Sequence, residues 1–191
     1  MTSLRCLSSS LFYRAICVGI AMFGFSVAAA GQVPSSTQVA EMGKLDFLIG
    51  EWKGQGWEFK LDGSRANSFS QKTNVQAREG DATLRIKDER AFKPLKGTMG
   101  RSKLDAIISY DETVKLYHWR GKNSKSILEA KLLSDRTFHY GMPFSITVEP
   151  RDGYRRTTIE VNENGEWHET LEVWVRGKWY KFEESILKKA K

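Results

Sequence analysis

The stretch LDFLIGEWKGQGWEFKL, residues 45–61, places three glycines and two tryptophans among aliphatic and charged residues. Glycine weakens a strand interior and often marks a bend or the close approach of another backbone. Trp52, Gly54 and Gly56 share one face of an extended chain, because successive side chains point to opposite faces. The pattern predicts a coiled first strand at a corner of a small β-barrel, with Trp52 filling the closed end.

From Glu51 onward, short runs rich in aromatic and β-branched residues alternate with turn sequences such as NENGE and VRGK, which is typical of consecutive strands. Without helix-length crossovers between them, these strands pair in antiparallel fashion. We therefore expect an all-β fold, an up-and-down antiparallel β-barrel of about ten strands. A two-sheet sandwich is the alternative. The expected strands cover residues 51–61, 67–78, 81–91, 103–110, 114–121, 126–134, 136–141, 144–150, 154–161, 166–175 and 178–188.

A short helix is expected before the first strand. Apolar residues recur at every third position from Val39 to Leu48, which predicts a helix over 38–48 with Ser36 or Thr37 as its N-cap. Gly50 is expected to end it.

Residues 1–30 have the pattern of a signal peptide: a basic start without acids, an apolar run too short to span a bilayer well, and three alanines. We expect cleavage near Ala30 and export to the periplasm or beyond, with no stable membrane span afterwards. An uncleaved N-terminal anchor is the alternative. Residues 31–37 then form a linker and 38–191 a single domain. Both cysteines lie in the removed segment, so the mature chain is expected to have no disulfide.

The charge pattern argues against a nucleic-acid partner. The chain has a formal net charge of +7, but its basic residues are scattered and often adjoin acids, as in IKDER. A nucleic-acid-binding protein concentrates them on one face. The sequence does not specify an oligomeric state.

Three segments, in order, resemble known barrels. The G-x-W-x-G-x-G opening resembles the first strand of nitrobindin-like and related lipocalin-like (calycin-type) barrels; it consists of Gly50, Trp52, Gly54 and Gly56. The segments ISYD…Y and W-x-E…W resemble a bacterial exported lipocalin-like family of unknown function. Their matching residues are Tyr110, Asp111, Tyr117, Trp167, Glu169, Trp179, Glu183 or Glu184, and Leu187. The resemblance implies an up-and-down barrel and an exported protein.

The nitrobindin branch binds haem through a histidine near the end of the barrel, and this sequence departs from that pattern. His118, His139 and His168 each alternate with aromatic residues expected to point inward, so all three should face outward. Haem is therefore disfavoured and no cofactor is expected. The chain has no H-x-H or H-E-x-x-H motif, so we expect no metal site. Nucleophile-elbow and phosphate-loop motifs are absent as well, and no catalytic residue is assigned.

A cavity is the remaining candidate site, since a barrel of this size holds one small ligand or a packed core. The expected ligand is small and apolar or amphipathic. The candidate ligand-binding residues are Trp57, Tyr110, Tyr117, Trp119, Trp167, Glu169 and Glu183. The connection at 93–102 is either a lid over the mouth or an ordinary loop.

Two further functions stay open. Glu169 and Glu183 are candidates for an acid–base pair in an enzyme, although buried carboxylates often have only a structural role, paired with an arginine. Arg85, Arg101 and Arg156 are the arginines considered for that role. Alternatively, the barrel is filled and serves as an envelope interaction scaffold, with exposed residues such as Trp174 forming a contact patch.

Overall fold

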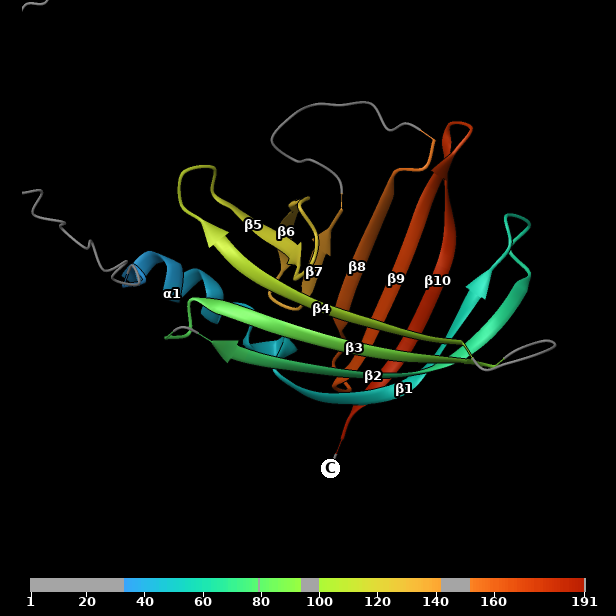
Figure 1. Cartoon of the computed structure of the whole chain (residues 1–191), viewed down its shortest axis with the longest axis horizontal. Coiled ribbons are helices and arrows are strands. Elements are labelled where there is room, and N and C mark those ends of the chain that lie inside the picture. The colour runs from blue at the N-terminus through green and yellow to red at the C-terminus, as the bar shows by residue number, and fades with distance from the viewer. Residues whose placement is uncertain (1–32, 79, 94–99, 142–151, 191) are drawn as a thin grey trace, which may run out of the picture. The chain divides into compact units, whose positions relative to one another are not determined.

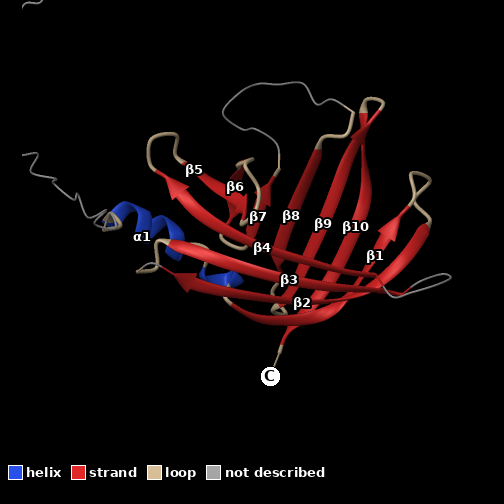
Figure 2. Cartoon of the chain, viewed as in Figure 1, coloured by secondary structure: helices blue, strands red, loops and turns tan. Residues whose placement is uncertain are grey.

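The computed structural model describes residues 33–78, 80–93, 100–141 and 152–190. The chain divides into two units, residues 1–32 and 33–191, and all described residues belong to the second (Figures 1 and 2). No helix among these residues is long and apolar enough to cross a membrane. The elements are α1 (Ser36–Gly43), the 3-10 helix η1 (Asp46–Leu48), β1 (Gly50–Phe59), β2 (Arg65–Arg78), β3 (Thr83–Lys93), β4 (Gly100–Asp111), β5 (Leu116–Gly121), β6 (Leu128–Ser134), β7 (Thr137–Tyr140), β8 (Arg155–Val161), β9 (Glu166–Val175) and β10 (Lys178–Lys189).

The ten strands form a closed antiparallel barrel, in which each strand pairs with its neighbour in sequence and β10 closes the ring on β1. Trp52 in β1 lies opposite Thr73 of β2 on one side and Lys189 of β10 on the other. The expected up-and-down barrel is confirmed, and the sandwich alternative is excluded. Closure removes the sheet edges that would otherwise present unpaired backbone groups.

The strand boundaries follow the sequence pattern closely, with one visible difference. β3 continues to Lys93 and β4 begins at Gly100, so the connection expected at 93–102 is shorter than predicted. Its residues 94–99 and the expected strand at 144–150 lie outside the described residues.

The helix is shorter than predicted and begins one position earlier than the proposed N-caps allow. Ser35 is the N-cap: its Oγ accepts a hydrogen bond from the Gln38 backbone at 3.0 Å, and the Gln38 side chain accepts one from the Ser35 N–H at 3.2 Å. This reciprocal capping box fixes the start of α1. The helix ends at Gly43 and the chain tightens into η1, so the prediction of a continuous helix ended by Gly50 was wrong.

α1 and η1 lie at one end of the barrel (Figure 1) and close it with apolar side chains. Leu45 and Leu48 are fully buried, and the carbonyl of Leu48 accepts a hydrogen bond from Trp52 Nε1 at 2.9 Å. The Trp52 and Trp167 rings pack at 5.4 Å between centroids. The core of this closed end comprises Met42, Leu45, Leu48, Trp52, Val75, Leu84, Ile86, Ala106, Ile108, Tyr117, Trp119, Ala130, Phe138, Ile159, Val161, Trp167 and Leu187.

Gly54 and Gly56 allow close packing at the β1 corner. A Cβ atom on Gly54 would lie 2.0 Å from the backbone oxygen of Ile186 in β10, and one on Gly56 would lie 2.3 Å from the Phe69 ring. Any larger residue would push β1 away from β10 or from the ring. This is the close backbone approach that the spacing of these glycines indicates.

A β-bulge in β10 determines which of its side chains face inward. The register with β9 shifts between Lys181 and Glu183, and one extra residue reverses the alternation. The bulge places Glu183 opposite the inward-facing Leu171, and Tyr180 opposite Val173. Strict alternation, which groups Glu183 with Trp179, therefore cannot assign the faces of this strand.

Candidate functional site

A cluster of charged side chains lies inside the barrel, centred on Arg90. Along β3, buried residues alternate with exposed ones, so that Leu84, Ile86 and Asp88 point inward and Arg90 follows them on the same face. On this inner face of β3, the apolar residues lie near the start of the strand and the charged ones nearer its end. The inner wall therefore changes from hydrocarbon to charge along the barrel.

Three carboxylates surround the Arg90 guanidinium. Its Nε donates to Asp88 Oδ2 at 2.8 Å and one terminal nitrogen donates to Glu169 Oε1 at 3.2 Å. The other terminal nitrogen donates to Glu183 Oε2. β3, β9 and β10 thus contribute to one buried ion-pair network.

Polar side chains extend the network on its β2 side. Thr73 Oγ1 donates to Asp88 Oδ1 at 2.7 Å, and the Gln71 amide donates to Thr73 Oγ1 and to Glu169 Oε2, both at 3.2 Å. Glu169 Oε2 also lies 3.4 Å from Trp167 Nε1. Each carboxylate therefore accepts hydrogen bonds, as buried charges require.

Burial and charge shift the pKa values in opposite ways. Burial by itself lowers the pKa of Arg90, but Glu169, Asp88 and Glu183 more than offset this and raise it above its ordinary value. Burial raises the pKa of Glu169; Arg90 opposes the shift and Asp88 adds to it. Arg90 therefore stays charged, whereas Glu169 holds its proton to higher pH than an ordinary glutamate.

The cluster is not completely packed. The side chains of Glu169 and Arg90 keep 12% and 17% of their exposure, although both sit on the inner wall. Gln71 and Ser185 are almost fully buried, yet within the described part of the chain Gln71 Oε1 and Ser185 Oγ have no hydrogen-bond partner. Ser185 lies directly opposite Glu169 in the sheet. Both are therefore enclosed polar atoms without a partner among the described residues.

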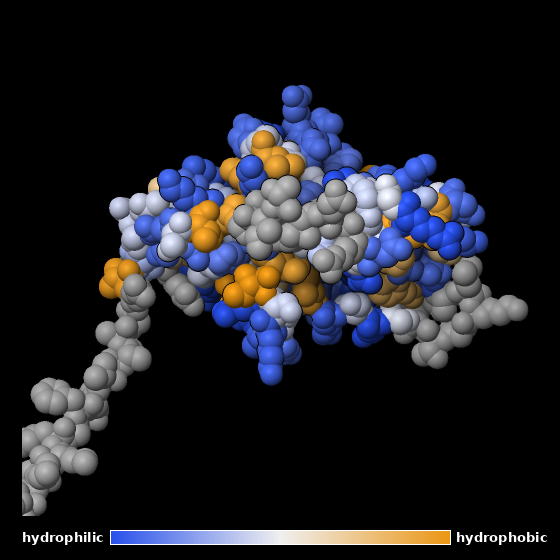
Figure 3. Space-filling model, turned by 90° about the horizontal axis from the view of Figure 1, so that it is seen from above, coloured by the Kyte–Doolittle hydropathy of each residue, from blue (hydrophilic) through white to orange (hydrophobic). Residues whose placement is uncertain are grey.

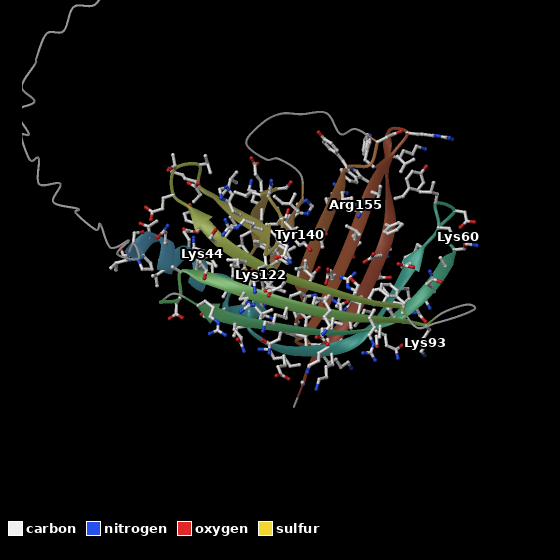
Figure 4. The ribbon with its side chains drawn as sticks, in the orientation of Figure 1. Lys44, Lys60, Lys93, Lys122, Tyr140 and Arg155 are labelled. Atoms are coloured by element: carbon white, nitrogen blue, oxygen red, sulfur yellow. The ribbon has the colours of Figure 1, made fainter. Side chains whose placement is uncertain are left out.

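A hollow of about 510 Å³ opens beside the cluster, and its wall is mainly apolar. Tyr140 from β7 and Arg155 from β8 both contribute to it (Figure 4). The hollow is lined by Leu128, Tyr140, Gly141, Gly153, Tyr154, Arg155, Thr157 and Leu171.

The sheet register connects the hollow to the cluster. Tyr140, Thr157, Leu171 and Glu183 lie side by side on four adjacent strands, β7 to β10. The first three line the hollow, and the fourth binds Arg90. Burial, and then the charge of Glu169, raise the pKa of Tyr140. An apolar space and a polar cluster thus share one inner wall.

Four residues predicted for the site lie at or beside it. Glu169 and Glu183 belong to the cluster, and Trp167 packs beneath it in the closed end. Trp119 stacks on Tyr140 with ring centroids 4.0 Å apart and planes 3° from parallel. Trp119 therefore supports one wall of the hollow rather than lining it.

The other three predicted residues lie elsewhere. Trp57 falls on the outer face of β1, opposite to Trp52, with the Arg65 guanidinium 4.5 Å from its ring. Tyr117 belongs to the closed end, where its hydroxyl donates to the Glu41 carbonyl at 3.0 Å. Tyr110 packs edge-on against Tyr117. Tyr117 thus connects α1 to the barrel, and Tyr110 packs against it.

The histidines lie on the outer faces of their strands, as the alternation predicts. His118 and His168 face acids at 3.9 Å and 3.7 Å. His139 is nearly buried beside Thr158, and burial lowers its pKa. In the part of the chain that the structure describes, no group of three histidine, cysteine or acidic residues is arranged to hold a metal.

The arginine at the centre of the cluster is not among those considered from the sequence. Arg85 and Arg156 lie on outer faces and pair with Asp105 and Glu172, and Arg101 is exposed. Arg90 has a recognisable signal: it continues the alternation of LRIKDER, two positions after Asp88. Because Arg90 occupies the same alternate positions of the strand as the apolar Leu84 and Ile86, its side chain points inward.

The outer surface carries different chemistry. Seen from above, it is largely hydrophilic with separate hydrophobic patches (Figure 3). A hollow of about 460 Å³ across β1 to β4 has Gln71 and Arg90 of the cluster among its mostly charged and polar lining residues. Another of about 650 Å³, across β3, β4 and the residues that follow β5, includes Asp88. Trp174 packs edge-on against Trp179, over which the Arg156 guanidinium lies at 4.3 Å. Trp174 is therefore half-buried in an outer aromatic cluster.

The architecture defines a class: a ten-stranded up-and-down barrel with one end filled and a hollow beside a polar cluster. Two solved structures share this fold. An S-type phycobiliprotein lyase, CPES, from Guillardia theta aligns with a TM-score of 0.56 at 10% identity, over 80% of this chain and 93% of its own. A protein of unknown function from the DUF3598 family of Nostoc punctiforme aligns with a TM-score of 0.51 at 13% identity, over 76% of this chain.

The chain spans about half the length of the Nostoc protein, 49%. Neither a protein-family model nor a curated protein matches the sequence. At these identities the similarity shows a common lipocalin-like barrel fold and leaves the function to the site itself.

Proposed function

We propose that this protein is an exported lipocalin-like barrel that binds one small amphipathic molecule. The apolar part of the ligand occupies the hollow lined by Leu128, Tyr140 and Leu171, and its polar end reaches the Arg90 cluster. No chemical step is assigned to the protein.

The observation that carries this proposal is the apolar hollow of about 510 Å³, whose lining residue Leu171 is the cross-strand partner of Glu183 in the Arg90 cluster. Small-molecule sites commonly have volumes of about 300–1,000 Å³, mostly apolar walls and a few placed polar groups. The similarity to a phycobiliprotein lyase supports a barrel of this kind, at the level of the fold.

An acid–base role for Glu169 and Glu183 has weaker support, because both carboxylates bind the same arginine. Their ion pairs match the structural role that the sequence leaves open. The export part of the proposal depends on the signal-peptide pattern of residues 1–30, which lie outside the described residues.

Native and denaturing mass spectrometry of the full-length chain, expressed with export and purified, tests the proposal. We expect a denatured mass matching cleavage after Ala30, together with extra mass under native conditions only. Leu171→Trp, which fills the hollow, should abolish the extra mass. Leu133→Trp, at a position that is 55% exposed, should retain it. Extra mass that survives Leu171→Trp would contradict binding in the hollow.

A further inference from the structure

The inner wall of the barrel has an excess of negative charge, although the chain as a whole is basic. Four acidic side chains lie on inner faces among the described residues: Glu58, Asp88, Glu169 and Glu183. Arg90 is the buried cation that faces them. The other cations in inner-face positions of this part of the chain, Arg155, Lys178 and Lys189, are exposed at the strand ends. Arg90 is therefore the one buried cation set against four inner-face acids of the described residues, and it binds three of them.

Glu58 and Glu183 are direct cross-strand partners in the β1–β10 pair. Like charges in directly opposite positions of an antiparallel pair are destabilising. Glu58 accepts a hydrogen bond from Asn67 at 2.6 Å, whereas Glu183 binds Arg90. Asn67 brings no positive charge, so the pair retains an uncompensated negative charge.

Arg90 has little capacity left for an anionic ligand. Each of its three nitrogens already donates to a different carboxylate, and its guanidinium lies 5.1 Å from the Phe69 ring centroid. Two of its five N–H groups remain, but a ligand carboxylate or phosphate bound to them would lie beside these three carboxylates at short range.

Two buried side-chain atoms that have no hydrogen-bond partner in the described part of the chain lie beside the acids of the inner wall. Gln71 is 3% and Ser185 2% exposed, and both adjoin Glu169. Gln71 Oε1, an amide oxygen, can only accept hydrogen bonds. The amide nitrogen of the same side chain already donates to Thr73 and Glu169. Ser185 Oγ can accept as well as donate. Gln71 Oε1 therefore adds another acceptor, and no donor, to a wall that already has an excess of carboxylate oxygens.

From these contacts we infer that the polar end of the ligand is a cation, an alkylammonium or amidinium group, recognised by the cross-strand acids Glu58 and Glu183. The inference depends on the proposed binding function and specifies the class of ligand. Arg155 lies at the mouth of the barrel, two positions before Thr157 on β8. Its charge is therefore distant from the acids deeper on the inner wall and does not compensate them. The apolar tail of such a ligand lies against Leu171 and Tyr140.

Three probes with the same tail and different head groups test the inference: decylamine, decanol and decanoate. Titration calorimetry at pH 7, below the micellar concentration of each probe, gives their dissociation constants for the exported protein. We expect decylamine to bind at least about tenfold more tightly than decanol, since ion pairs are strong in a partly buried site. Decanoate should bind most weakly.

Two inner-wall variants and one outer control locate the preference. Glu183→Gln and Glu58→Gln should each reduce the preference for decylamine over decanol about threefold or more. Glu58→Gln leaves the Arg90 network intact and can still accept from Asn67, so it serves if Glu183→Gln does not fold. Glu184→Gln is the matched control, because Glu184 lies on the outer face beside Lys181; the preference should not change.

The outcomes separate the two proposals. Equal binding of the three probes, or tighter binding of decanoate, would overturn the cationic head group and leave the binding function standing. Loss of the preference in Glu184→Gln as well would refute the assigned position. Failure of all three probes to bind would count against the binding function itself.

Discussion

Replacing Arg90 by methionine should destabilise the protein strongly and make its stability depend on pH. Methionine keeps an unbranched apolar side chain at this position but removes the cation shared by Asp88, Glu169 and Glu183. Removing one partner of a buried ion pair typically costs about 3–5 kcal/mol, because the remaining charge stays buried without compensation.

The carboxyls can limit this cost by taking up protons. Arg90 opposes the effect of burial on the pKa of Glu169, so its removal raises that pKa further. A glutamate with an unfolded-state pKa of about 4.3 that must stay protonated at pH 7 costs up to about 3.7 kcal/mol, at about 1.36 kcal/mol per pH unit. At pH 5 the same cost is about 1 kcal/mol.

The sign of the dependence follows from proton binding. In the variant, folded Glu169 binds its proton more tightly than the unfolded chain does, so folding is favoured at low pH and opposed as the pH rises. We expect a loss of about 3–4 kcal/mol in the free energy of unfolding at pH 7 and of about 1 kcal/mol at pH 5.

Urea unfolding followed by tryptophan fluorescence at both pH values measures the difference. Arg85→Met is the control, since Arg85 lies on the outer face of the same strand and pairs with the partly exposed Asp105. That variant should lose much less stability than Arg90→Met at pH 7, because an exposed ion pair contributes little. An equal loss for Arg90→Met at pH 5 and pH 7 would refute the reasoning, since unpaired carboxylates must respond to protons.

Two further variants test how the barrel is built. Gly54→Ala should lose about 2–3 kcal/mol in urea unfolding, because its Cβ would lie 2.0 Å from the Ile186 oxygen; Gly43→Ala, with no other atom within 4 Å, should change stability by less than about 1 kcal/mol. Similar values for both would argue against a tight β1–β10 contact. Ser35→Ala should cost about 1 kcal/mol by removing the cap that bonds Gln38, and an unchanged urea midpoint would show that the closed end holds α1 without it.

The alternation of β9 shows how much of the site could be predicted. In WHETLEV, the phase of Trp167 contains Glu169 and Leu171, and the structure puts all three on the inner wall. The same rule placed the three histidines outward. It did not apply to β10, where the bulge after Lys181 changes the phase. A bulge depends on pairing with a neighbouring strand, and no local sequence signal fixed its position.

Tyr110 and Tyr117 show a second limit. Alternation states which face a side chain occupies but not how far along the barrel it lies. Tyr117 does face inward, yet it lies at the end that α1 closes and bonds to Glu41. The depth of a residue in the barrel is set by the stagger between strands and by the position of the helix.

The sequence by itself determined the strands, their order and most of their inner faces, because those depend on a period of two residues and on local turn chemistry. Tertiary structure alone decided which charges meet. Arg90 and Glu169 are 79 positions apart, and Arg90 and Glu183 are 93 apart. Only barrel closure, which pairs β1 with β10, brings β3, β9 and β10 around one interior. The polar cluster is therefore a property of the closed barrel.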